Sequence, residues 1–503
     1  MNERTPRESP IWARALALNA LSNPRFVPFA IAGLFAALAI RAVLEPFGDQ
    51  DAEWIAAAGR EMLATHAVPR TNGWSITDGD VPWVMHEWAL GPLYAVLTMW
   101  LGLAGPLCLG LIAAAITTAL LAAATIGRTK RLAAGALTCL VAMALTRECL
   151  VEPRPAYVVL GLPLAMLLLS HVEAPTKRRA IACVLLELAW ANVHGSFPLG
   201  LGVLALSLLA HDSHRSFRAL TLALAAAATL VTPYGTDLIG LVARYIVGGD
   251  SVAAAIHAHI AEFQPLWAAG PVFGGPFRVL GVVLVIAFGA IGAMRGERSA
   301  RFLAFGAALL GGISIVHARH VPQAITLSAA LLAPTIDRLI ANVSLETRPF
   351  DAAKVRRAIS VACAGIASMA TIATCVRGVH ADDALGGDAL PALAADPRVR
   401  DRAAYVAFDA SGRFVWLAPS ARVFFDPRND CYRGTTALAA YAIEEGDCVG
   451  DCFDATLARA HVEVAIVPDG HAALDSLVQS ARYEEVRRES GWHLFAIRTS
   501  ARR

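Results

Sequence analysis

Long apolar segments alternate with short polar loops along residues 26–376. The first apolar segment, 26–44, is long enough to cross a bilayer about 30 Å thick. Most of the later segments also reach span length if tilting and partly buried ends are allowed. These later segments are 89–127, 131–147, 156–171, 180–194, 197–211, 217–232, 277–294, 300–316, 322–340 and 357–376. The pattern predicts an α-helical polytopic membrane protein with about 11–13 spans.

Segment 89–127 leaves the number of crossings open. It is long enough for two spans that turn at 102–106, and a second span would reverse the orientation of everything that follows. We favour one crossing and a short extracytoplasmic or re-entrant piece. This interpretation gives about 11 spans, and about 12 or 13 are the alternatives.

Basic residues occupy alternate loops. The basic loops are 128–131, 176–179, 211–218, 295–301 and 337–357, and those with few free positive charges are 45–88, 147–155, 190–197, 232–267 and 317–321. The positive-inside rule places the basic loops and residues 1–25 in the cytoplasm. The other loops then lie outside, which in a bacterium means the periplasmic face of the inner membrane.

The pattern changes after the transmembrane domain, 26–376. Residues 377–400 read as a linker, and 401–503 contain no apolar run of span length. Strand-like runs at 402–410, 413–418, 421–426, 461–469 and 492–498 are interleaved with helix-like runs at 436–445 and 472–486. We therefore predict a small soluble α/β domain, which an odd number of spans places outside the cytoplasm.

Composition agrees with a membrane protein. Hydrophobic residues make up 56% of the 503-residue chain and charged residues 17%, against about 25% charged residues in soluble proteins. The net charge of +2 gives no reason to expect nucleic acid as a partner. Six cysteines lie in or beside apolar segments, where small packed side chains are expected: Cys108, Cys139, Cys149, Cys183, Cys363 and Cys375.

The remaining cysteines, Cys431, Cys448 and Cys452, lie in the predicted extracytoplasmic domain. An oxidising compartment would allow a disulfide there. The spacing does not select which two of them pair.

Loop 45–88 is the longest polar run in the first two thirds of the chain. Asp49, Asp51 and Glu53 follow the first span directly. A carboxylate at the membrane surface is suited to act as a general base on a lipid-linked substrate, or to hold a divalent metal. The structural alternative is helix capping, with Asp51 as the N-cap, at a solvated interface.

His86 and Glu87 close the same loop. They could share a metal or a proton, although a structural hydrogen bond explains them equally well. Adjacent residues of a helix point about 100° apart, so the two side chains need not reach one site.

Polar residues also recur at the ends of other spans, namely Arg154, Asn192, His194, Arg319 and His320. The two arginines are candidates for binding phosphate, because a guanidinium contacts two oxyanions at once. Salt bridges to nearby glutamates are the alternative. The sequence has no P-loop and no G-x-S-x-G motif, so ATP-driven transport and serine-hydrolase chemistry have no support.

An ordered set of motifs resembles a broad group of bacterial membrane proteins akin to the GT-C glycosyltransferases. That superfamily includes the protein O-mannosyltransferases and the lipid A aminoarabinose transferases. The resemblance covers nearly the whole chain. Its motifs here are DQDAEW (49–54), GR (59–60), VPRTNGWSIT (68–77), PWVMHEW (82–88), RP (154–155), WANVHGSF (190–197), TPYG (232–235), EFQP (262–265) and VFFDPRNDCY (423–432).

The resemblance implies a GT-C-like fold, a polyprenyl-phosphate sugar as donor and an extracytoplasmic active site in the first loop. It implies that Asp51 deprotonates the acceptor, with Asp49 in reserve. Three residues depart from the group: Ile55 replaces a His, Asn72 an Asp and Thr232 an Asn. If the lost His and Asp are catalytic in the group, this copy is weak or inactive.

The first hypothesis is therefore a membrane glycosyltransferase that transfers a sugar from a polyprenyl-phosphate donor to an extracytoplasmic glycan, lipid or protein acceptor. Asp51 is the predicted base, and Asp49 and Glu53 are its electrostatic neighbours. The predicted substrate-binding residues are His86, Glu87, Arg154, Asn192, His194, Arg319 and His320.

Two alternatives stay open. The first is a non-catalytic protein that binds lipid-linked glycans, and the second is a transporter. A transporter would place ionisable residues at mid-span, whereas here they gather at span ends. No cofactor and no set of metal ligands is assigned. A divalent metal is an alternative use of the loop carboxylates.

Overall fold

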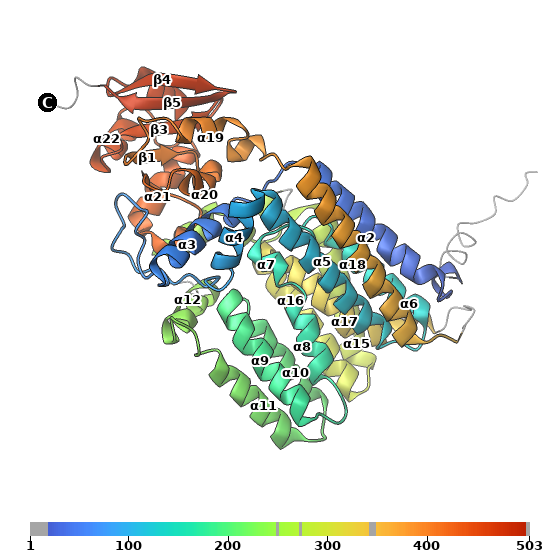
Figure 1. Ribbon diagram of the computed structural model, residues 1–503. Coiled ribbons are helices and arrows are strands. Elements are labelled where there is room, and N and C mark those ends of the chain that lie inside the picture. Colours follow the sequence, from blue (N-terminus) through green and yellow to red (C-terminus); the bar gives the residue numbers. More distant parts are fainter. Residues whose placement is uncertain (1–18, 248–250, 271–273, 342–348, 499–503) are drawn as a thin grey trace, which may run out of the picture.

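The computed structural model describes residues 19–247, 251–270, 274–341 and 349–498. Residues 1–18 of the predicted cytoplasmic N-terminus and 342–348 of a basic loop lie outside the described residues. A bundle of helices forms most of the molecule, and a small domain built on a sheet sits at one end of it (Figure 1).

The predicted apolar segments are helical. Five described helices are each long and apolar enough to cross a membrane: α2 (Phe26–Leu44), α5 (Ala104–Ile126), α15 (Pro276–Arg295), α16 (Arg298–Val316) and α18 (Ala352–Arg377). Around them lie α4 (Gly91–Leu101), α6 (Leu132–Leu145), α7 (Pro155–Val158), α8 (Leu162–Ser170), α9 (Lys177–Val193), α10 (Pro198–Ala210), α11 (Arg215–Ala228) and α17 (Val321–Ile340). The multi-pass membrane architecture is confirmed, and the exact number of crossings stays a prediction.

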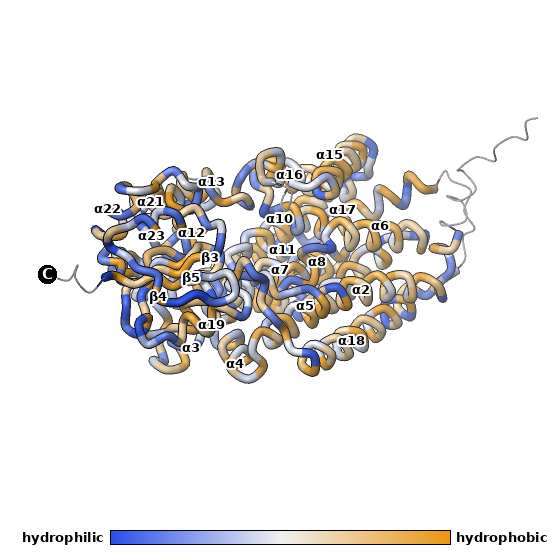
Figure 2. Tube along the Cα trace, turned by 90° about the horizontal axis from the view of Figure 1, so that it is seen from above, coloured by the Kyte–Doolittle hydropathy of each residue, from blue (hydrophilic) through white to orange (hydrophobic). Residues whose placement is uncertain are grey.

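The bundle presents apolar side chains on its outside. On α18, Val361, Met369 and Ile372 are each more than 60% exposed, at 66%, 64% and 64%. Hydrophobic colouring runs through the helices of the bundle, whereas hydrophilic segments are denser around the sheet (Figure 2). An apolar surface of this extent is explained by contact with lipid.

Segment 89–127 forms α4 and α5, which meet at Gly102 with φ +57°. The 11 residues of α4 rise about 17 Å, less than the roughly 30 Å of a bilayer core. The helix packs instead on α3 (Asp51–Thr65). A Cβ at Gly59 would lie only 1.9 Å from the carbonyl oxygen of Gly91. This geometry supports one crossing preceded by a short helix that does not span the bilayer, and the side of the membrane on which this helix lies stays a prediction.

The two kinds of loop gather at opposite ends of the bundle. At the basic end, Arg298 Nη1 lies 3.0 Å from Asp212 Oδ2 in a neighbouring basic loop. At the other end, Trp88 Nε1 donates to Asn192 Oδ1 at 2.9 Å. The predicted grouping of the loops is therefore what the structure shows, and the side of the membrane that each group faces stays a prediction.

The C-terminal domain is α/β, as predicted. Its sheet has the order β2-β1-β3-β5-β4, in which β1 pairs in parallel with β2 and β3 while the β3–β5 and β5–β4 pairs are antiparallel. The strands are β1 (Ala403–Val406), β2 (Arg422–Val423), β3 (Val464–Pro468), β4 (Tyr483–Glu489) and β5 (Trp492–Ile497). The helices are η3 (Asp383–Leu385), α19 (Ala389–Ala394), α20 (Phe408–Leu417), η4 (Asn429–Cys431), α21 (Gly434–Glu444), α22 (Asp451–Arg459) and α23 (Leu474–Gln479).

Three local predictions in this region are wrong. Run 413–418 belongs to helix α20 and not to a strand, and the end of run 472–486 belongs to strand β4 and not to a helix. The predicted linker 377–400 contains η3 and α19. Leu390 and Leu393 of α19 are fully buried in one cluster with the sheet. Their spacing places them on the same helix face, which explains why this segment folds onto the sheet.

The first loop and the C-terminal domain form one unit. Ser75 pairs in parallel with Val423 of β2, and Ile76 N donates to the carbonyl oxygen of Val423 at 2.9 Å. Close to the start of the loop, Phe47 pairs with Ala381. The loop is therefore held by backbone hydrogen bonds and extends the edge of the sheet.

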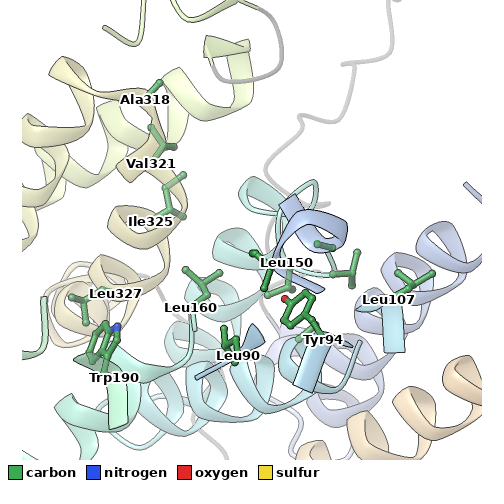
Figure 3. Close-up of a cluster of buried hydrophobic side chains, with 14 of the residues drawn as sticks. Leu90, Tyr94, Leu107, Leu150, Leu160, Trp190, Ala318, Val321, Ile325 and Leu327 are labelled. Atoms are coloured by element: carbon green, nitrogen blue, oxygen red, sulfur yellow. The ribbon is translucent and has the colours of Figure 1, made fainter. Parts of the chain in front are cut away.

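A buried apolar cluster around Tyr94 supports loop 147–155 from the side of the bundle. Figure 3 shows Tyr94 of α4 beside Leu107 and Leu150, and Tyr94 is fully buried. Its hydroxyl donates to the carbonyl oxygen of Pro153. Helix α4 thereby fixes the loop 147–155, which carries Arg154.

Candidate functional site

Two acidic residues lie at the turn where α2 leads into α3. Asp49 Oδ1 accepts a hydrogen bond from Asp51 N, the first residue of α3, at 3.0 Å. The N-cap residue of α3 is Gln50, so the prediction of Asp51 as the N-cap is wrong. The Asp49 side chain is fully buried, whereas that of Asp51 is 25% exposed. Trp54 Nε1 donates to Asp51 Oδ1 at 3.1 Å. Asp51 is therefore the accessible acid of the pair.

The guanidinium of Arg154 lies among four carboxylates. Its Nε is 3.6 Å from Asp49 Oδ1, 3.4 Å from Asp51 Oδ2 and 3.5 Å from Glu152 Oε1. Its Nη1 donates to Glu262 Oε2 at 2.9 Å. We call these five residues the acid cluster. The sequence left two possibilities for Arg154, phosphate binding and salt bridges to nearby acids. The structure shows the salt bridges.

Burial and mutual repulsion shift Asp49, Asp51 and Glu152 toward their protonated forms. Burial, then the charge of Asp51, raises the pKa of Asp49 to about 8. Burial also raises the pKa of Asp51, while Arg154 opposes that rise. A carboxylate with a raised pKa has a higher affinity for a proton, which favours general base catalysis as long as the group is ionised when the acceptor binds.

Glu53 does not join the acid cluster. It lies two residues after Asp51 on α3, and positions two apart point about 200° apart around a helix. Its Oε2 is 3.5 Å from Nε of Arg413 on α20, and both side chains are buried. Burial raises the pKa of Glu53 to about 7, and Arg413 opposes the rise. The predicted role as electrostatic neighbour of Asp51 therefore has no geometric support.

Helix α20 also packs directly on the acid turn. A Cβ at Gly412 would lie 2.6 Å from the carbonyl oxygen of Gln50, the residue between the two acids, and 3.3 Å from Cδ1 of Trp54. The C-terminal domain thus braces the backbone that holds Asp49 and Asp51. Nothing in the sequence pattern indicated this contact, because it joins residues more than 350 positions apart.

His86, Glu87 and His194 form a second group. His86 Nδ1 lies 2.5 Å from Glu87 Oε2, and the rings of His86 and His194 stack with centroids 5.5 Å apart. One ligand atom from each of the three residues lies within 4.8 Å of the others. Two histidines and a carboxylate are a donor set that zinc and similar divalent ions accept.

The hydrogen bonds of His194 bear on what this group can bind. Ser196 N donates to His194 Nδ1 at 3.0 Å, so a neutral His194 carries its proton on Nε2. Burial lowers the pKa of His194 well below its ordinary value, so the ring is neutral. In this tautomer Nε2 is a donor that suits an anion. A metal on Nε2 would require the other tautomer.

The other predicted residues take different positions. Asn192 has a structural role, because Nδ2 donates to the carbonyl oxygens of Leu188 and Val231 while Oδ1 accepts from Trp88. The guanidinium of Arg319 lies 4.1 Å from the centroid of Phe263. Within the part of the chain that the structure describes, no carboxylate forms a salt bridge with Arg319.

His320 follows Arg319 and is neutral at ordinary pH. Burial, then the charge of Arg319, lowers its pKa to about 3. The charge of Arg319 also adds to the burial that lowers the pKa of His194, and it opposes the rise that Glu87 causes in the pKa of His86. These residues therefore share one electrostatic environment at the end of the bundle that carries the first loop. Arg319 is better placed than Arg154 to bind an anion, because four carboxylates already surround Arg154.

Asn72, one of the departures from the resembled group, belongs to the contact between loop and domain. Its Oδ1 accepts from Arg428 Nη2 at 2.6 Å, and its Nδ2 donates to the carbonyl oxygen of Cys431 at 3.0 Å. The Arg428 guanidinium lies 4.2 Å and 4.6 Å from the rings of Trp74 and Trp83. The residue at position 72 therefore shapes this contact and lies outside the acid cluster.

The cysteine pairing left open by the spacing is Cys448 with Cys452, whose sulfurs are 2.06 Å apart. Cys431 is a free buried thiol that donates to the carbonyl oxygen of Arg428 at 3.1 Å.

The fold and the site define a multi-pass membrane protein in which the first extramembrane loop and two later loops bring the acid cluster together beneath a C-terminal α/β domain. Among solved structures, the archaeal oligosaccharyltransferase AglB from Archaeoglobus fulgidus, in complex with an inhibitory peptide and a dolichol-phosphate, matches with a TM-score of 0.54 at 11% identity. The match covers 88% of this chain and 69% of that chain.

ArnT from Cupriavidus metallidurans bound to undecaprenyl phosphate matches with a TM-score of 0.52 at 16% identity, over 93% of this chain and 98% of that chain. Its apo form matches with a TM-score of 0.52 at 15% identity, over the same shares of the two chains. No family model and no curated protein matches the chain. At these identities the likeness shows the fold, and it confirms the GT-C-like fold expected from the resemblance.

Proposed function

We propose that the protein is a membrane glycosyltransferase that transfers a sugar from a polyprenyl-phosphate donor to an acceptor outside the cytoplasm. The observation that carries the proposal is the turn that presents Asp51 beside Arg154 at the loop end of a GT-C-like bundle. Two solved structures of this fold hold a dolichol-phosphate and an undecaprenyl phosphate. They support a lipid phosphate as the class of donor.

In this proposal Asp51 is the base. Its side chain is the more exposed of the two acids at the turn, and burial raises its pKa, which increases the affinity of its carboxylate for a proton. The acceptor hydroxyl gives its proton to Asp51, and its oxygen bonds to the anomeric carbon. The bond from that carbon to the phosphate oxygen breaks, and polyprenyl phosphate leaves with the electron pair. Such a step requires a positioned base and a stabilised leaving group.

Arg319 is the proposed partner of the leaving phosphate. It has aromatic rings beneath it, and in the described residues no carboxylate neutralises it. The Nε2 proton of His194 offers a second donor in the same environment. Arg154 instead has the role of holding Asp49 and Asp51 in place, because its charge is already shared among four acids.

We further propose that the loop end of the bundle faces the periplasm of a bacterial inner membrane. The basic loops lie at the opposite end, which the positive-inside rule assigns to the cytoplasm. The disulfide between Cys448 and Cys452 supports the same orientation, because disulfides persist in oxidising compartments.

The test is complementation of a deletion strain with Asp51→Asn, in which lipid-linked and surface glycans are measured by mass spectrometry. Asn keeps the size of the side chain and cannot accept the proton, so we expect glycan transfer to fall by about 10²-fold or more. Glu45→Gln is the matched control, because Glu45 is an exposed acid four positions before Asp49 that pairs only locally with Arg41.

Full restoration by Asp51→Asn would remove Asp51 from the mechanism. Asp49→Asn would then be tested in the same way. If that variant also restores the glycan, a protein that binds lipid-linked glycans without catalysis explains the site better.

A further inference from the structure

Two cysteines that the sequence assigned to ordinary packing face each other across two helices. Sγ of Cys108 on α5 and Sγ of Cys375 on α18 are 3.9 Å apart. The Cys108 thiol also lies 3.9 Å from the carbonyl oxygen of Thr371, one turn before Cys375. Helices α5 and α18 pack closely against each other. The two sulfurs therefore approach through a tight helix contact that holds them together.

The pair lies where α18 leaves the bundle for the C-terminal domain. Cys108 is the fifth residue of α5, and Cys375 is the third residue from the end of α18. Cys375 is exposed. Close by, Arg377 Nη1 donates to the carbonyl oxygen of Val43 at 2.7 Å, which marks the polar boundary of the bundle. The Cys375 thiol therefore lies near the end of the span on the side of the C-terminal domain.

The same side of the molecule carries an existing disulfide. Cys448 and Cys452 are bonded in the C-terminal domain, which sits on the end of the bundle where α18 terminates (Figure 1). A structural disulfide there indicates an oxidising compartment. Cys139 on α6 and Cys363 on α18 differ from Cys375 in exposure, because both of their side chains are fully buried.

We propose that Cys108 and Cys375 form a disulfide that joins α5 to α18. An oxidised thiol–disulfide exchange protein is the required oxidant. The Cys375 thiolate attacks a sulfur of that protein's disulfide and forms a mixed disulfide. The Cys108 thiolate then attacks the Cys375 sulfur, and the exchange protein leaves as its second thiolate. The two thiols lose two protons and two electrons, and the exchange protein is reduced to its dithiol. The sulfurs close from 3.9 Å to about 2.05 Å.

This bond would tie the attachment point of the C-terminal domain to the bundle. Helix α18 ends at Arg377 and the chain reaches the pairing of Ala381 with Phe47 a few residues later. Helix α5 follows directly after α4, which packs on α3. The bond therefore links the helix that carries the domain to the layer that supports the acid cluster. The proposal does not depend on the glycosyltransferase assignment.

The test uses the full chain with a protease site inserted after Glu297, an exposed residue between α15 and α16. Free thiols are trapped in intact cells with N-ethylmaleimide, membranes are cleaved, and the fragments are run on gels with and without reductant. The existing disulfide cannot join the two fragments, because Cys448 and Cys452 both lie in the second one.

We expect the fragments to migrate together without reductant and to separate with it. Cys375→Ser should separate them in both conditions, whereas the control Cys363→Ser should leave them joined. Separation of the wild-type fragments without reductant would overturn the proposal. Where a variant does not accumulate, peptide mapping of the trapped wild-type protein decides, because N-ethylmaleimide on Cys108 and Cys375 before reduction would also overturn it.

Discussion

At the scale of single residues, partners decide the role of each charged group. Arg154 and Arg319 were equivalent candidates in the sequence, yet four carboxylates surround the first and aromatic rings support the second. Asp51 and Glu53 are neighbours in sequence, yet one faces Arg154 and the other faces Arg413. The residue type therefore shows which side chains could have a role, and the contacts in the folded protein show which role each can have.

Asn72→Asp tests whether the departure at position 72 weakens the protein. Asp cannot donate to the carbonyl oxygen of Cys431, so two acceptor oxygens would face each other in a buried site. We expect a loss of about 1–3 kcal/mol in the free energy of unfolding and no gain of activity. Thermal unfolding of the purified protein and complementation of the deletion strain are the measurements.

Asn23→Asp is the control for this substitution. The Asn23 side chain uses only its oxygen, which accepts from Arg25 N at 3.0 Å, and Asp keeps that acceptor. Its unfolding temperature should remain close to that of the wild type. Increased glycan transfer by Asn72→Asp would instead show that position 72 contributes to catalysis.

At the scale of elements, α3 is positioned from both sides by close backbone contacts. Gly59 meets Gly91 of α4, and the turn before α3 meets Gly412 of α20. Each contact depends on the absence of a Cβ, because a methyl group would overlap with backbone atoms. The orientation of the acid cluster therefore follows from how α3 packs, and α20 of a distant domain takes part in it.

Gly412→Ala should move the acid turn. The added Cβ would lie 2.6 Å from the carbonyl oxygen of Gln50, and overpacking of this kind costs about 1–3 kcal/mol. We expect a lower unfolding temperature and reduced glycan transfer. Gly365→Ala on α18 is the control, because nothing lies within 4 Å of the position that a Cβ would take there.

The two glycine variants should change the stability of the protein in opposite directions. Alanine in a helix is favoured over glycine by up to about 1 kcal/mol, so Gly365→Ala should be neutral or slightly stabilising. If Gly412→Ala were equally stable and fully active, α20 would not brace the acid turn.

At the scale of the whole molecule, charge and packing divide the protein into two ends. The basic loops contact one another at one end, while the acid loop, the other polar loops and the C-terminal domain assemble at the opposite end (Figure 1). A membrane between these ends separates the charged regions. The bundle then exposes apolar side chains to lipid.

Reporter fusions test this orientation. Alkaline phosphatase fused at the C-terminus should be active, and the same enzyme inserted into loop 128–131 should be inactive, because the reporter folds only in an oxidising compartment and basic loops stay in the cytoplasm. A fluorescent reporter that matures only in the cytoplasm should give the reverse pattern. Active phosphatase in loop 128–131 would contradict the proposed topology.

The membrane helices and the α/β character of the last hundred residues could be predicted from the sequence, and the role of loop 45–88 as the site stays a prediction. Hydrophobic length and periodicity are local properties, so they can be read from consecutive residues. Hydrophobic periodicity does not tell whether a short apolar run forms a helix or a strand. That ambiguity explains why residues 413–418 were expected as a strand and fold into α20.

Which side chains contact one another could be seen only in the folded protein. The neighbours of Arg154 come from three separate loops, and Gly412 reaches the acid turn from the C-terminal domain. Such contacts depend on how helices and strands pack, and residue order does not encode them locally. The distribution of charge along the chain separated the two ends of the molecule, and the packing of α3 against α4 and α20 placed Asp49 and Asp51 beside Arg154 at one of them.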